Sequence, residues 1–353
     1  MVHHRYVKMK KSCIRVLKKK GEPIRRALLE MDLLDNSARI SSEGEYLLLP
    51  LTREPEETEL KELPGEFELT EDEFEQQKGQ LKLEDLLDVV PHFEVVGDIA
   101  LIEDDVVEPE KVADAIMKVK KNVKTVLAAM SPVEGEFRTR RFRTIAGEDR
   151  TSTIHREYGS RFCIDLERAY FTPRLATERS RILEQVTGGQ TIVDMFAGVG
   201  PYSIMLARKS PDIRVIAIDK NPDAVEFLRR NVELNSVQNV EAIEGDANLE
   251  AEKYAGVADH VIMNLPHNAH DFLDAAVKIC AKNGVIHYYD ITPEDDLFES
   301  SLKLIDEATK RAGRTTELVD SRVVRSYAPH QFNVCIEVRI LSVSYTHLTL
   351  PTN

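Results

Sequence analysis

The chain has 353 residues, of which 42% are hydrophobic and 31% are charged, and this composition is typical of a globular protein of two or three domains. No apolar run approaches the roughly 18 residues that a membrane-spanning helix needs, and the basic N-terminus lacks the apolar segment of a secretion signal. The four cysteines are scattered without a C-x-x-C pair, which excludes a disulfide framework and an evident metal site and makes a cytoplasmic location the default.

The net charge of −14 hides a strong segregation of charge along the chain. Residues 1–26 carry ten Lys or Arg against one acid, residues 54–110 carry 21 acids against three Lys, and residues 138–181 carry eleven Arg, six acids and no Lys. Most charge runs are solvated helix faces. The stretch with Arg alone favours nucleic-acid binding, because Arg makes bidentate phosphate contacts and binding depends on local potential rather than net charge.

The first 166 residues are expected to form two small α+β domains. A module over 9–53 alternates strand, helix and strand, and the acidic, proline-containing stretch 54–80 is expected to be a linker. A middle domain over 81–166 should contain a helix at Pro109–Lys121 and a mainly antiparallel sheet. Short strands of that sheet are expected at Arg138–Ile145, Thr151–Arg156 and Ser160–Leu166.

The segment 167–341 alternates strands and helices, which predicts an α/β domain with a doubly wound, mostly parallel, Rossmann-like sheet. Strands are expected at Thr191–Phe196, Arg214–Asp219, Val240–Glu244, His260–Asn264, Gly284–Ile291, Thr316–Val324 and Phe332–Leu341, and helices at Pro201–Lys209, Pro222–Asn235, Ala269–Ala281 and Glu294–Arg311. The tail Ser342–Asn353 has no charged side chain and no periodicity, so we expect it to be non-native.

The strongest local signal is the stretch Val193–Pro201, where an apolar strand ends at Asp194, turns on Gly198 and Gly200 and enters a helix. The glycines allow the backbone to approach a ligand closely and supply the freedom that the turn needs. The third glycine of a dinucleotide-binding G-x-G-x-x-G is missing, which disfavours a nicotinamide or flavin cofactor.

Polar residues also follow the next three strands. Asp219 precedes Lys220 after the second strand, where an acid can accept hydrogen bonds from ribose hydroxyls, and Asp246 follows the third, where an acid can bind an adenine amine. Acids in this order suit a cofactor with a sugar and an adenine but no phosphates, such as S-adenosylmethionine, although each alone would be read as a solvent-facing loop residue. Asn264, before Pro266, either holds the cofactor amine together with a substrate base or initiates a turn.

These motifs together make the chain resemble the tRNA (guanine-37-N1)-methyltransferases of archaeal and eukaryotic type. The residues that carry the resemblance are DMFAGVGPYSI, AIDKNP, EGDA, NLP, GVIHYYDI and YFTPRLATER. It extends over about Ser12–Leu341 and implies a class I methyltransferase-type domain with two smaller N-terminal domains, S-adenosylmethionine as cofactor and no metal. The implied partner is a tRNA with guanine at position 37, whose outer corner docks on the first domain, and a monomer is plausible.

The resemblance also implies roles for single residues. Glu178 would be the general base for the N1 proton, Arg138 would contact O6 of the flipped guanine, and Tyr170 and Arg174 would position the base or the anticodon backbone. The residues implied to bind the cofactor are Asp194, Phe196, Gly198, Gly200, Asp219, Lys220, Asp246, Ala247, Asn264 and Pro266, and Asn264 is also implied in catalysis. Arg140 and Arg141 are alternatives for Arg138, and without the resemblance Glu178 would be read as an exposed helix carboxylate paired with Arg181.

The chemistry of guanine supports these roles. The N1 lone pair is unavailable until its proton leaves, so a carboxylate must take that proton, and an Arg can stabilise the charge that builds on O6. Three alternatives remain: aminocarboxypropyl transfer in wyosine synthesis, methylation of the tricyclic wyosine precursor, and RNA binding with a vestigial cofactor pocket. The enzymes of aminocarboxypropyl transfer generally lack the Asn-Leu-Pro element, and its presence here favours methyl transfer.

Overall fold

The computed structural model describes residues 8–75, 81–133 and 135–342. The chain divides into two compact units, Met1–Val90 and Pro91–Asn353. The tail that was expected to be non-native lies outside the described residues from position 343 onward. No helix among the described residues combines the length and apolar character that crossing a membrane requires.

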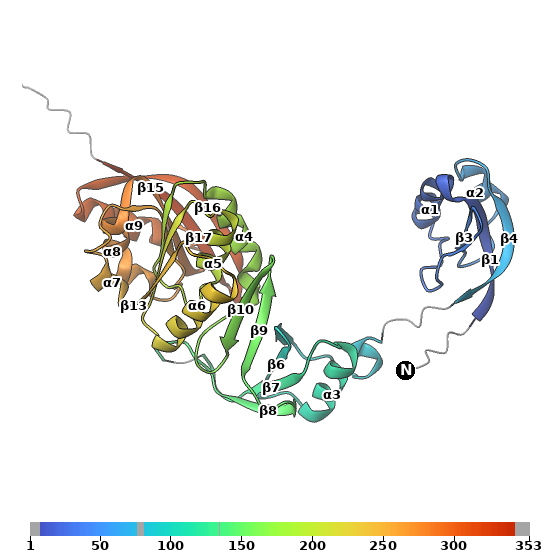
Figure 1. Cartoon of the computed structure of the whole chain (residues 1–353), viewed down its shortest axis with the longest axis horizontal. Coiled ribbons are helices and arrows are strands. Elements are labelled where there is room, and N and C mark those ends of the chain that lie inside the picture. The colour runs from blue at the N-terminus through green and yellow to red at the C-terminus, as the bar shows by residue number, and fades with distance from the viewer. Residues whose placement is uncertain (1–7, 76–80, 134, 343–353) are drawn as a thin grey trace, which may run out of the picture. The chain divides into compact units, whose positions relative to one another are not determined.

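The first unit is built on a four-stranded antiparallel sheet with the strand order β2-β3-β1-β4 (Figure 1). Its elements are β1 (Lys8–Leu17), η1 (Lys18–Lys20), α1 (Gly21–Glu30), β2 (Ser41–Glu43), β3 (Tyr46–Pro50), α2 (Glu57–Glu62), β4 (Glu68–Glu75) and η2 (Leu83–Asp85). The apolar face of α1, with Ile24 and Leu28, packs on Ile14 and Leu49 of the sheet. This small core agrees with the strand, helix and strand predicted over 9–53.

The stretch 54–80 was expected to be a linker, and over its described part this prediction is wrong. It forms helix α2 and strand β4, and β4 pairs with β1 along eight residues. The acids of β4 lie opposite the bases of β1, with Lys10 Nζ 2.5 Å from Glu71 and Arg15 Nη1 3.1 Å from Glu68. Because opposite charges across a strand pair stabilise it, the acidic run is the partner of the basic run and not a spacer.

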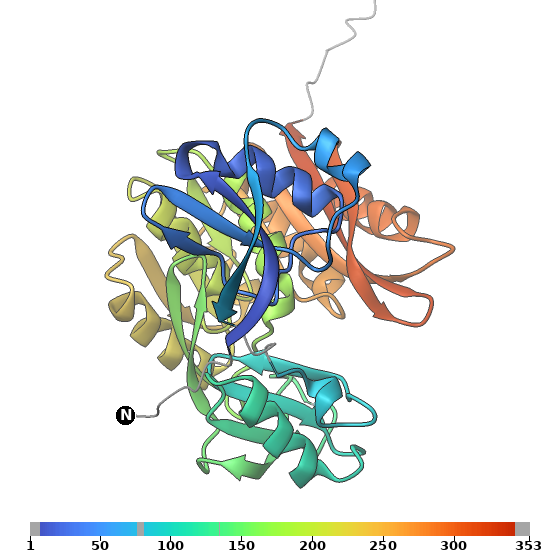
Figure 2. The ribbon, with the colours of Figure 1, turned by 90° about the vertical axis from the view of Figure 1, so that its right-hand side faces the viewer.

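The second unit begins with a four-stranded sheet in the order β5-β6-β7-β8, in which only β6 and β7 are parallel. Its elements are β5 (Phe93–Val96), β6 (Ile99–Glu103), α3 (Pro109–Val119), β7 (Thr125–Ala129) and β8 (Phe142–Gly147). The predicted helix is confirmed as α3, which contacts β7 and β8 (Figure 2). The strand expected from Arg138 begins only at Phe142, so Arg138 lies in a loop.

The last two strands expected in the middle domain form a separate hairpin, β9 (Ser152–Glu157) and β10 (Ser160–Asp165). This hairpin packs on helix α6 (Pro222–Leu234). The Cys163 amide donates to Asn231 Oδ1 at 2.6 Å, and Phe162 and Ile164 share a core with Leu228. The hairpin is therefore part of the packing of the following domain, ahead of the expected boundary at 166.

The third segment folds around a seven-stranded sheet in the order β13-β12-β11-β14-β15-β17-β16. The first five strands in this order are parallel, and β17 is antiparallel to both of its neighbours. The strands are β11 (Thr191–Asp194), β12 (Arg214–Asp219), β13 (Val240–Glu244), β14 (Ala258–Met263), β15 (Cys280–Pro293), β16 (Arg314–Ala328) and β17 (Gln331–Ser342). The predicted doubly wound, mostly parallel sheet is confirmed.

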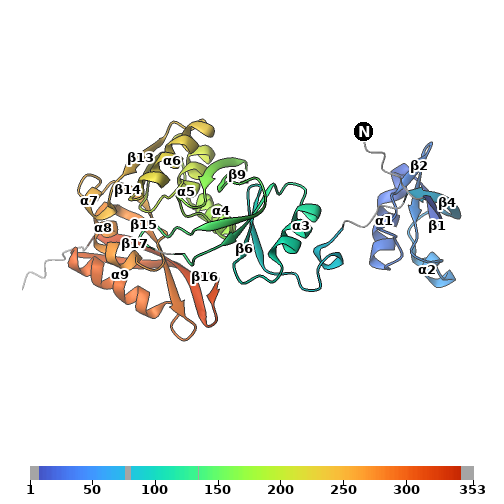
Figure 3. The ribbon, with the colours of Figure 1, turned by 90° about the horizontal axis from the view of Figure 1, so that it is seen from below.

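Helices cover both faces of this sheet (Figure 3). They are η3 (Pro173–Leu175), α4 (Ala176–Gln185), α5 (Pro201–Lys209), α6, α7 (Ala247–Glu250), η4 (Ala269–Phe272), α8 (Leu273–Ile279) and α9 (Glu299–Arg311). On one face Leu273 of α8 and Ile305 of α9 pack in one core with Val261. On the other face Ile182 of α4 packs with Leu206 of α5. This arrangement leaves the carboxyl ends of the parallel strands as the open edge where ligands bind in such sheets.

Candidate functional site

A cavity of ≈ 430 Å³ lies at the carboxyl edge of the parallel strands, and its volume is typical of a site for a small organic molecule. The structure brings ten of the fourteen residues singled out in the sequence to the wall of this cavity. They are Arg138, Tyr170, Phe196, Gly198, Asp219, Lys220, Asp246, Ala247, Asn264 and Pro266. Glu178, Asp194, Gly200 and Arg174 lie outside the wall.

The glycine turn after β11 shapes the floor of the cavity. Gly198 has φ +54°, and its amide donates to Asp219 Oδ2 at 2.7 Å, which ties the turns after β11 and β12 together. Gly200 has φ +88°, and a Cβ there would lie 2.3 Å from Leu228 Cδ1. Gly200 therefore acts through the shape of the turn, because it brings α5 close to α6 without lining the cavity itself.

Asp194 was expected to bind the cofactor, and the structure corrects this expectation. Its side chain is 1% exposed and lies beneath the turn, where Oδ2 accepts a hydrogen bond of 2.7 Å from Ser203 Oγ on α5. Burial raises the pKa of Asp194 to about 7, against the lowering effect of the Ser203 hydrogen bond. The residue thus holds helix α5 to the end of β11, and its side chain is not part of the cavity wall.

The acids after β12 and β13 do line the cavity. Asp219 Oδ1 accepts from the Asn221 amide at 2.9 Å, and burial raises the pKa of Asp219. Asp246 caps α7 with its side chain. Lys220 Nζ lies 2.5 Å from Glu136 and 3.4 Å from Asp246, so it bridges a loop of the middle domain and the turn after β13. Of these residues Asp219 and Asp246 are placed to accept hydrogen bonds from a bound sugar and base.

The opposite wall comes from loops that lie far from these turns in the sequence. Arg138 has φ +55° in the loop between β7 and β8, and its guanidinium lies 5.0 Å from the centre of the Tyr170 ring, so a cation and an aromatic face line the wall together. Arg138 is the arginine that faces the cavity, because Arg140 pairs with Glu103 at 2.6 Å and Arg141 is not part of the wall.

Three polar atoms of the cavity residues are buried and have no hydrogen-bond partner among the described residues. They are Asn264 Oδ1 after β14, Arg325 Nε on β16 and Asn333 Oδ1 on β17. Buried polar atoms are nearly always hydrogen-bonded in folded proteins, so three such atoms around one cavity indicate that a polar ligand belongs there.

Glu178 and Arg174 lie outside the wall. The Arg174 guanidinium pairs with Glu94 of β5 at 3.2 Å. Glu178 is 6% exposed and not the exposed helix carboxylate that its position in α4 suggested. It accepts hydrogen bonds from Arg181 at 2.6 and 3.0 Å and from the Tyr289 hydroxyl at 2.8 Å. Burial by itself raises the pKa of Glu178, but the bonds and charge of Arg181 lower it overall.

The sequence did not reveal several further polar residues of the wall, of which four are prominent. Arg325, Tyr327 and Asn333 belong to the hairpin β16–β17, which carries no recognisable motif. Arg179 is 2% exposed, and it forms two bonds of 2.7 and 2.6 Å to Glu157 of β9. The one signal in the sequence was Asn333 between apolar residues at the start of β17, since a polar side chain that becomes buried must find a partner.

This sheet order, with a glycine turn after its first strand and acids after its second and third, defines a class I methyltransferase-type domain. The match to known proteins is more specific. The chain belongs to the TRM5/TYW2 methyltransferase family: the model of the TRM5/TYW2 methyltransferase domain matches residues 153–319. The tRNA methyltransferase 5 N-terminal domain matches residues 13–59, and the TYW2 N-terminal domain matches residues 75–151.

Two curated relatives show the range of the family. The chain is 41% identical to tRNA (guanine(37)-N(1))-methyltransferase Trm5b of Pyrococcus abyssi over 93% of this chain and 98% of that protein. It is 31% identical to tRNA(Phe) (4-demethylwyosine(37)-C(7)) aminocarboxypropyltransferase of Methanocaldococcus jannaschii, over 70% of this chain and 97% of that protein.

Two solved structures are similar along nearly the whole chain. One is a complex of aTrm5 with tRNALeu, with 34% identity, a TM-score of 0.66 and coverage of 93% of this chain and 99% of that one. The other is Trm5 of Methanocaldococcus jannaschii in complex with adenosine, with 33% identity, a TM-score of 0.60 and coverage of 94% and 100%.

Proposed function

We propose that this protein transfers the methyl group of S-adenosylmethionine to N1 of guanine 37 in tRNA. The observation that carries the proposal is one cavity whose first wall holds Gly198, Asp219, Asp246 and Asn264 and whose second wall holds Arg138 and Tyr170. A cofactor and a base can therefore meet in one space. The similarity to Trm5b proteins along nearly the whole chain, and to structures of a tRNA complex and an adenosine complex, supports the same reaction.

The first wall fits the cofactor. Asp219 ends the second strand, where a carboxylate accepts hydrogen bonds from ribose hydroxyls, and Asp246 and Ala247 lie where an adenine edge would meet the turn after β13. Asn264 Oδ1, which has no hydrogen-bond partner among the described residues, is an acceptor for an ammonium or amine group. When bound, S-adenosylmethionine supplies an electrophilic methyl group on a sulfonium sulfur. The wall need only hold it, and no metal is required.

The second wall fits a guanine that has left its stack, which costs less in a loop than in a duplex. Arg138 donates to O6, where negative charge builds as the N1 proton leaves, and Tyr170 packs beside it. Glu178, which lies outside the wall but is linked to it by hydrogen bonds, takes that proton. The Tyr202 hydroxyl, on a residue of the wall, donates to Tyr289 at 3.2 Å, and Tyr289 donates to Glu178 at 2.8 Å.

The further assignments concern the partner and the assembly. The first module over residues 8–75 docks on the tRNA, and the middle domain with Arg138 holds the anticodon loop. We infer that the protein acts as a monomer, since one chain carries both the cavity and the N-terminal domains that would hold the tRNA. We assign it to the cytoplasm, where its tRNA substrate is found and where thiols stay reduced, in agreement with four buried free cysteines.

The test is transfer of label from methyl-labelled S-adenosylmethionine to an unmodified tRNA with guanine 37, followed by mass spectrometry of the nucleosides. Label in 1-methylguanosine, and none when guanine 37 is replaced by another base, is the expected result. A nucleoside carrying an aminocarboxypropyl group would instead support the reaction of the more distant relative. RNA binding without cofactor binding would leave only the vestigial-pocket alternative.

The role of Glu178 is tested by Glu178→Gln. We expect single-turnover methyl transfer to slow by about 10²–10⁴-fold, since the proton acceptor is lost while the shape of the side chain stays. Cofactor affinity measured by calorimetry should change little, because Glu178 does not line the cavity. A comparable loss of cofactor affinity would show that the role of Glu178 is structural.

A further inference from the structure

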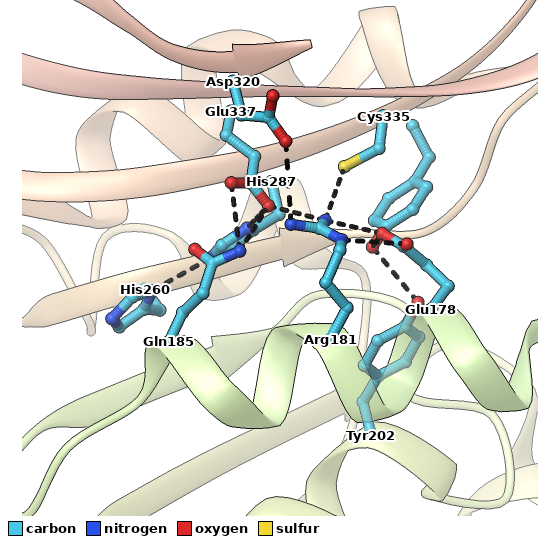
Figure 4. A network of polar contacts seen from close by, with 10 residues as sticks. Glu178, Arg181, Gln185, Tyr202, His260, His287, Asp320, Cys335 and Glu337 are labelled. Carbon is cyan, nitrogen blue, oxygen red and sulfur yellow. Dashed lines mark hydrogen bonds and ion pairs between the residues drawn. The ribbon is translucent and has the colours of Figure 1, made fainter. Parts of the chain in front are cut away.

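A buried polar network lies between helix α4 and strands β15 and β17, and the mechanism above uses only one end of it (Figure 4). At its centre Arg181 Nη2 lies 2.6 Å from Oε1 of Glu178 and 2.6 Å from Oε1 of Glu337. The Arg181 side chain is 18% exposed, and those of Glu178 and Glu337 are 5% and 2% exposed. One largely buried guanidinium is therefore shared by two buried carboxylates.

The two carboxylates are held unequally. Glu337 accepts from Gln185 Nε2 at 2.9 and 3.0 Å, and its Oε1 lies 2.9 Å from His287 Nδ1, so it is fixed from three sides once Arg181 is counted. Burial would raise the pKa of Glu337, but the contacts with His287 and Arg181 lower it overall. Glu337 is therefore an anchored anion.

Glu178 has fewer partners. Its Oε1 accepts from Arg181 and Tyr289, whereas its Oε2 accepts only from Arg181 Nε at 3.0 Å among the described residues. A carboxylate oxygen has two lone pairs in its plane, so Oε2 retains one for another donor. Tyr289 and Cys335 are paired across β15 and β17, and two residues along β17 from Cys335 lies Asn333, a residue of the cavity wall. Glu178 is separated from Tyr202 of the cavity wall by one hydrogen-bonded residue, Tyr289.

Resting on the proposed function, we propose that Arg181 is the positioning residue for methyl transfer: held by Glu337, it orients the Glu178 carboxylate with Oε2 open to the N1 proton. The N1–H bond breaks, its electron pair stays on nitrogen, and the proton adds to Oε2. A buried guanidinium left without a counter-charge would be costly. Glu337 removes that cost, because it remains ionised beside Arg181 after Glu178 is neutralised.

The ionisation of Glu178 depends on groups from every element packed around it. Besides Arg181, these groups are Tyr202 on α5, Tyr289 on β15, Asp320 and Arg322 on β16, and Cys335 and Glu337 on β17. Arg181 lowers the pKa of Glu178. Because Glu337 is a second carboxylate on the same guanidinium, its negative charge should oppose this effect through like-charge repulsion. Removal of Arg181 and removal of the Glu337 charge must therefore displace the ionisation of Glu178 in opposite directions.

The experiment compares the pH dependence of single-turnover methyl transfer to guanine 37 in the full-length protein and three variants. In Arg181→Met the rate should fall by about 10²-fold, with its acidic limb displaced to higher pH, because Glu178 and Glu337 then repel each other without a cation between them. In Glu337→Gln the rate should fall by about 10-fold, with the limb displaced to lower pH, because Glu178 then faces Arg181 alone. Arg311→Met, which breaks a pair with Asp274 on the protein surface, is the matched control and should leave the limb unmoved.

The proposal is overturned if the acidic limb of the pH–rate profile stays in place, or if it moves in the same direction in Arg181→Met and Glu337→Gln. A purely structural defect would lower the amount of active protein without changing the shape of this profile. If Arg181→Met does not fold, the double variant Arg181→Met/Glu337→Gln removes the charge imbalance, and Arg181→Lys keeps a cation without the bidentate fork. Arg181→Lys should then retain the position of the limb but not the full rate.

A second readout separates this inference from the proposed function. Carbon-13 NMR of glutamate-labelled protein follows the Glu178 carboxyl through a pH titration, with Glu178→Gln to assign its signal. The midpoint should rise in Arg181→Met and fall in Glu337→Gln whether or not guanine 37 is the substrate. Failure of the wild type to methylate guanine 37 would overturn the proposed function, whereas unchanged midpoints would overturn the role of Arg181.

Discussion

The two walls of the cavity are built in different ways. The cofactor wall consists of turns that follow the parallel strands β11 to β14 directly, and the register of those strands sets their spacing: Asp194 is paired with Ala217, and Asp219 with Glu244. The base wall is assembled from a loop of the middle domain, a loop before α4 and the hairpin β16–β17. Its members lie far apart in the sequence and are brought together only by the tertiary structure of the second unit.

This difference predicts where substitutions should act. Residues in the cofactor wall are held by hydrogen bonds from the backbone of the turns, as Asp219 is by the amides of Gly198 and Asn221. Replacing such a residue should therefore weaken cofactor binding. The base wall is held to the rest by a few side-chain pairs, such as Lys220 with Glu136. Replacements there should change the rate and leave the fold and the cofactor affinity in place.

Arg138→Met is the sharpest test of this division. We expect the rate of methyl transfer to fall by about 10²–10³-fold, the usual cost of losing one donor to a developing oxyanion, with unchanged cofactor affinity. Single-turnover kinetics and calorimetry measure the two quantities. Arg140→Met is the matched control, because Arg140 pairs with Glu103 outside the cavity. Equal losses in both variants would mean that general positive charge, and not contact with the base, explains the effect.

Asp219→Ala tests the other wall. Cofactor affinity should fall by about 10–100-fold, because the acceptor for the ribose is lost and the amides of Gly198 and Asn221 lose their partner. Calorimetric titration without tRNA measures this effect directly. Asp223→Ala on α6, whose carboxylate pairs with Arg168 at the surface, should bind the cofactor as the wild type does. A wild-type affinity in Asp219→Ala would contradict the assignment of this wall to the cofactor.

The same division separates what could be predicted from the sequence. Helix α5 and strands β12 and β13 have the bounds that apolar periodicity and the flanking Gly, Pro and Asp residues predicted. Eight of the predicted residues that line the cavity lie at the ends of parallel strands, where motifs are local and the register brings them together, whereas Arg138 and Tyr170 were predicted from the family resemblance alone. Asp194 was predicted to line the cofactor site and lies beneath it, since the sequence does not show to which side of the sheet the last side chain of a strand points.

What could not be predicted depends on pairing between distant segments. The acidic run 54–75 has the composition of a linker, and only its register with β1 shows that its acids face bases. The polar residues Arg325 and Asn333 enter the wall through the antiparallel pairing of β16 and β17, which no motif announces. Glu178 belongs to an amphipathic helix with charged neighbours, and its burial follows from packing against β15 and β17.

Asp194→Asn tests whether the buried carboxyl group beneath the cofactor wall makes folding stability depend on pH. Burial raises the pKa of Asp194 in the folded state to about 7 from an ordinary value of 3.8. Between these two values the unfolded chain ionises while the folded state keeps its proton, so folding stability declines as pH rises and levels off above 7. The variant should lose this decline and be more stable than the wild type at neutral pH, where the difference is largest. Urea unfolding across this pH range measures the difference, and a decline of equal size in both proteins would exclude Asp194 as its source.

Asn333→Ala should have the smallest effect of these variants. It tests most directly whether the two walls are built by separate strands. The side chain is 2% exposed, and its Oδ1 has no partner in the part of the chain that the structure describes, so its removal leaves no donor there without a partner and should change stability little. If β17 belongs to the base wall, methyl transfer should slow by less than about 10-fold, because one neutral hydrogen bond contributes about 0.5–1.5 kcal/mol. The cofactor affinity measured without tRNA should be unchanged. A loss in cofactor affinity instead of rate would place β17 with the cofactor, and the two walls would then not be separable by the strands that build them.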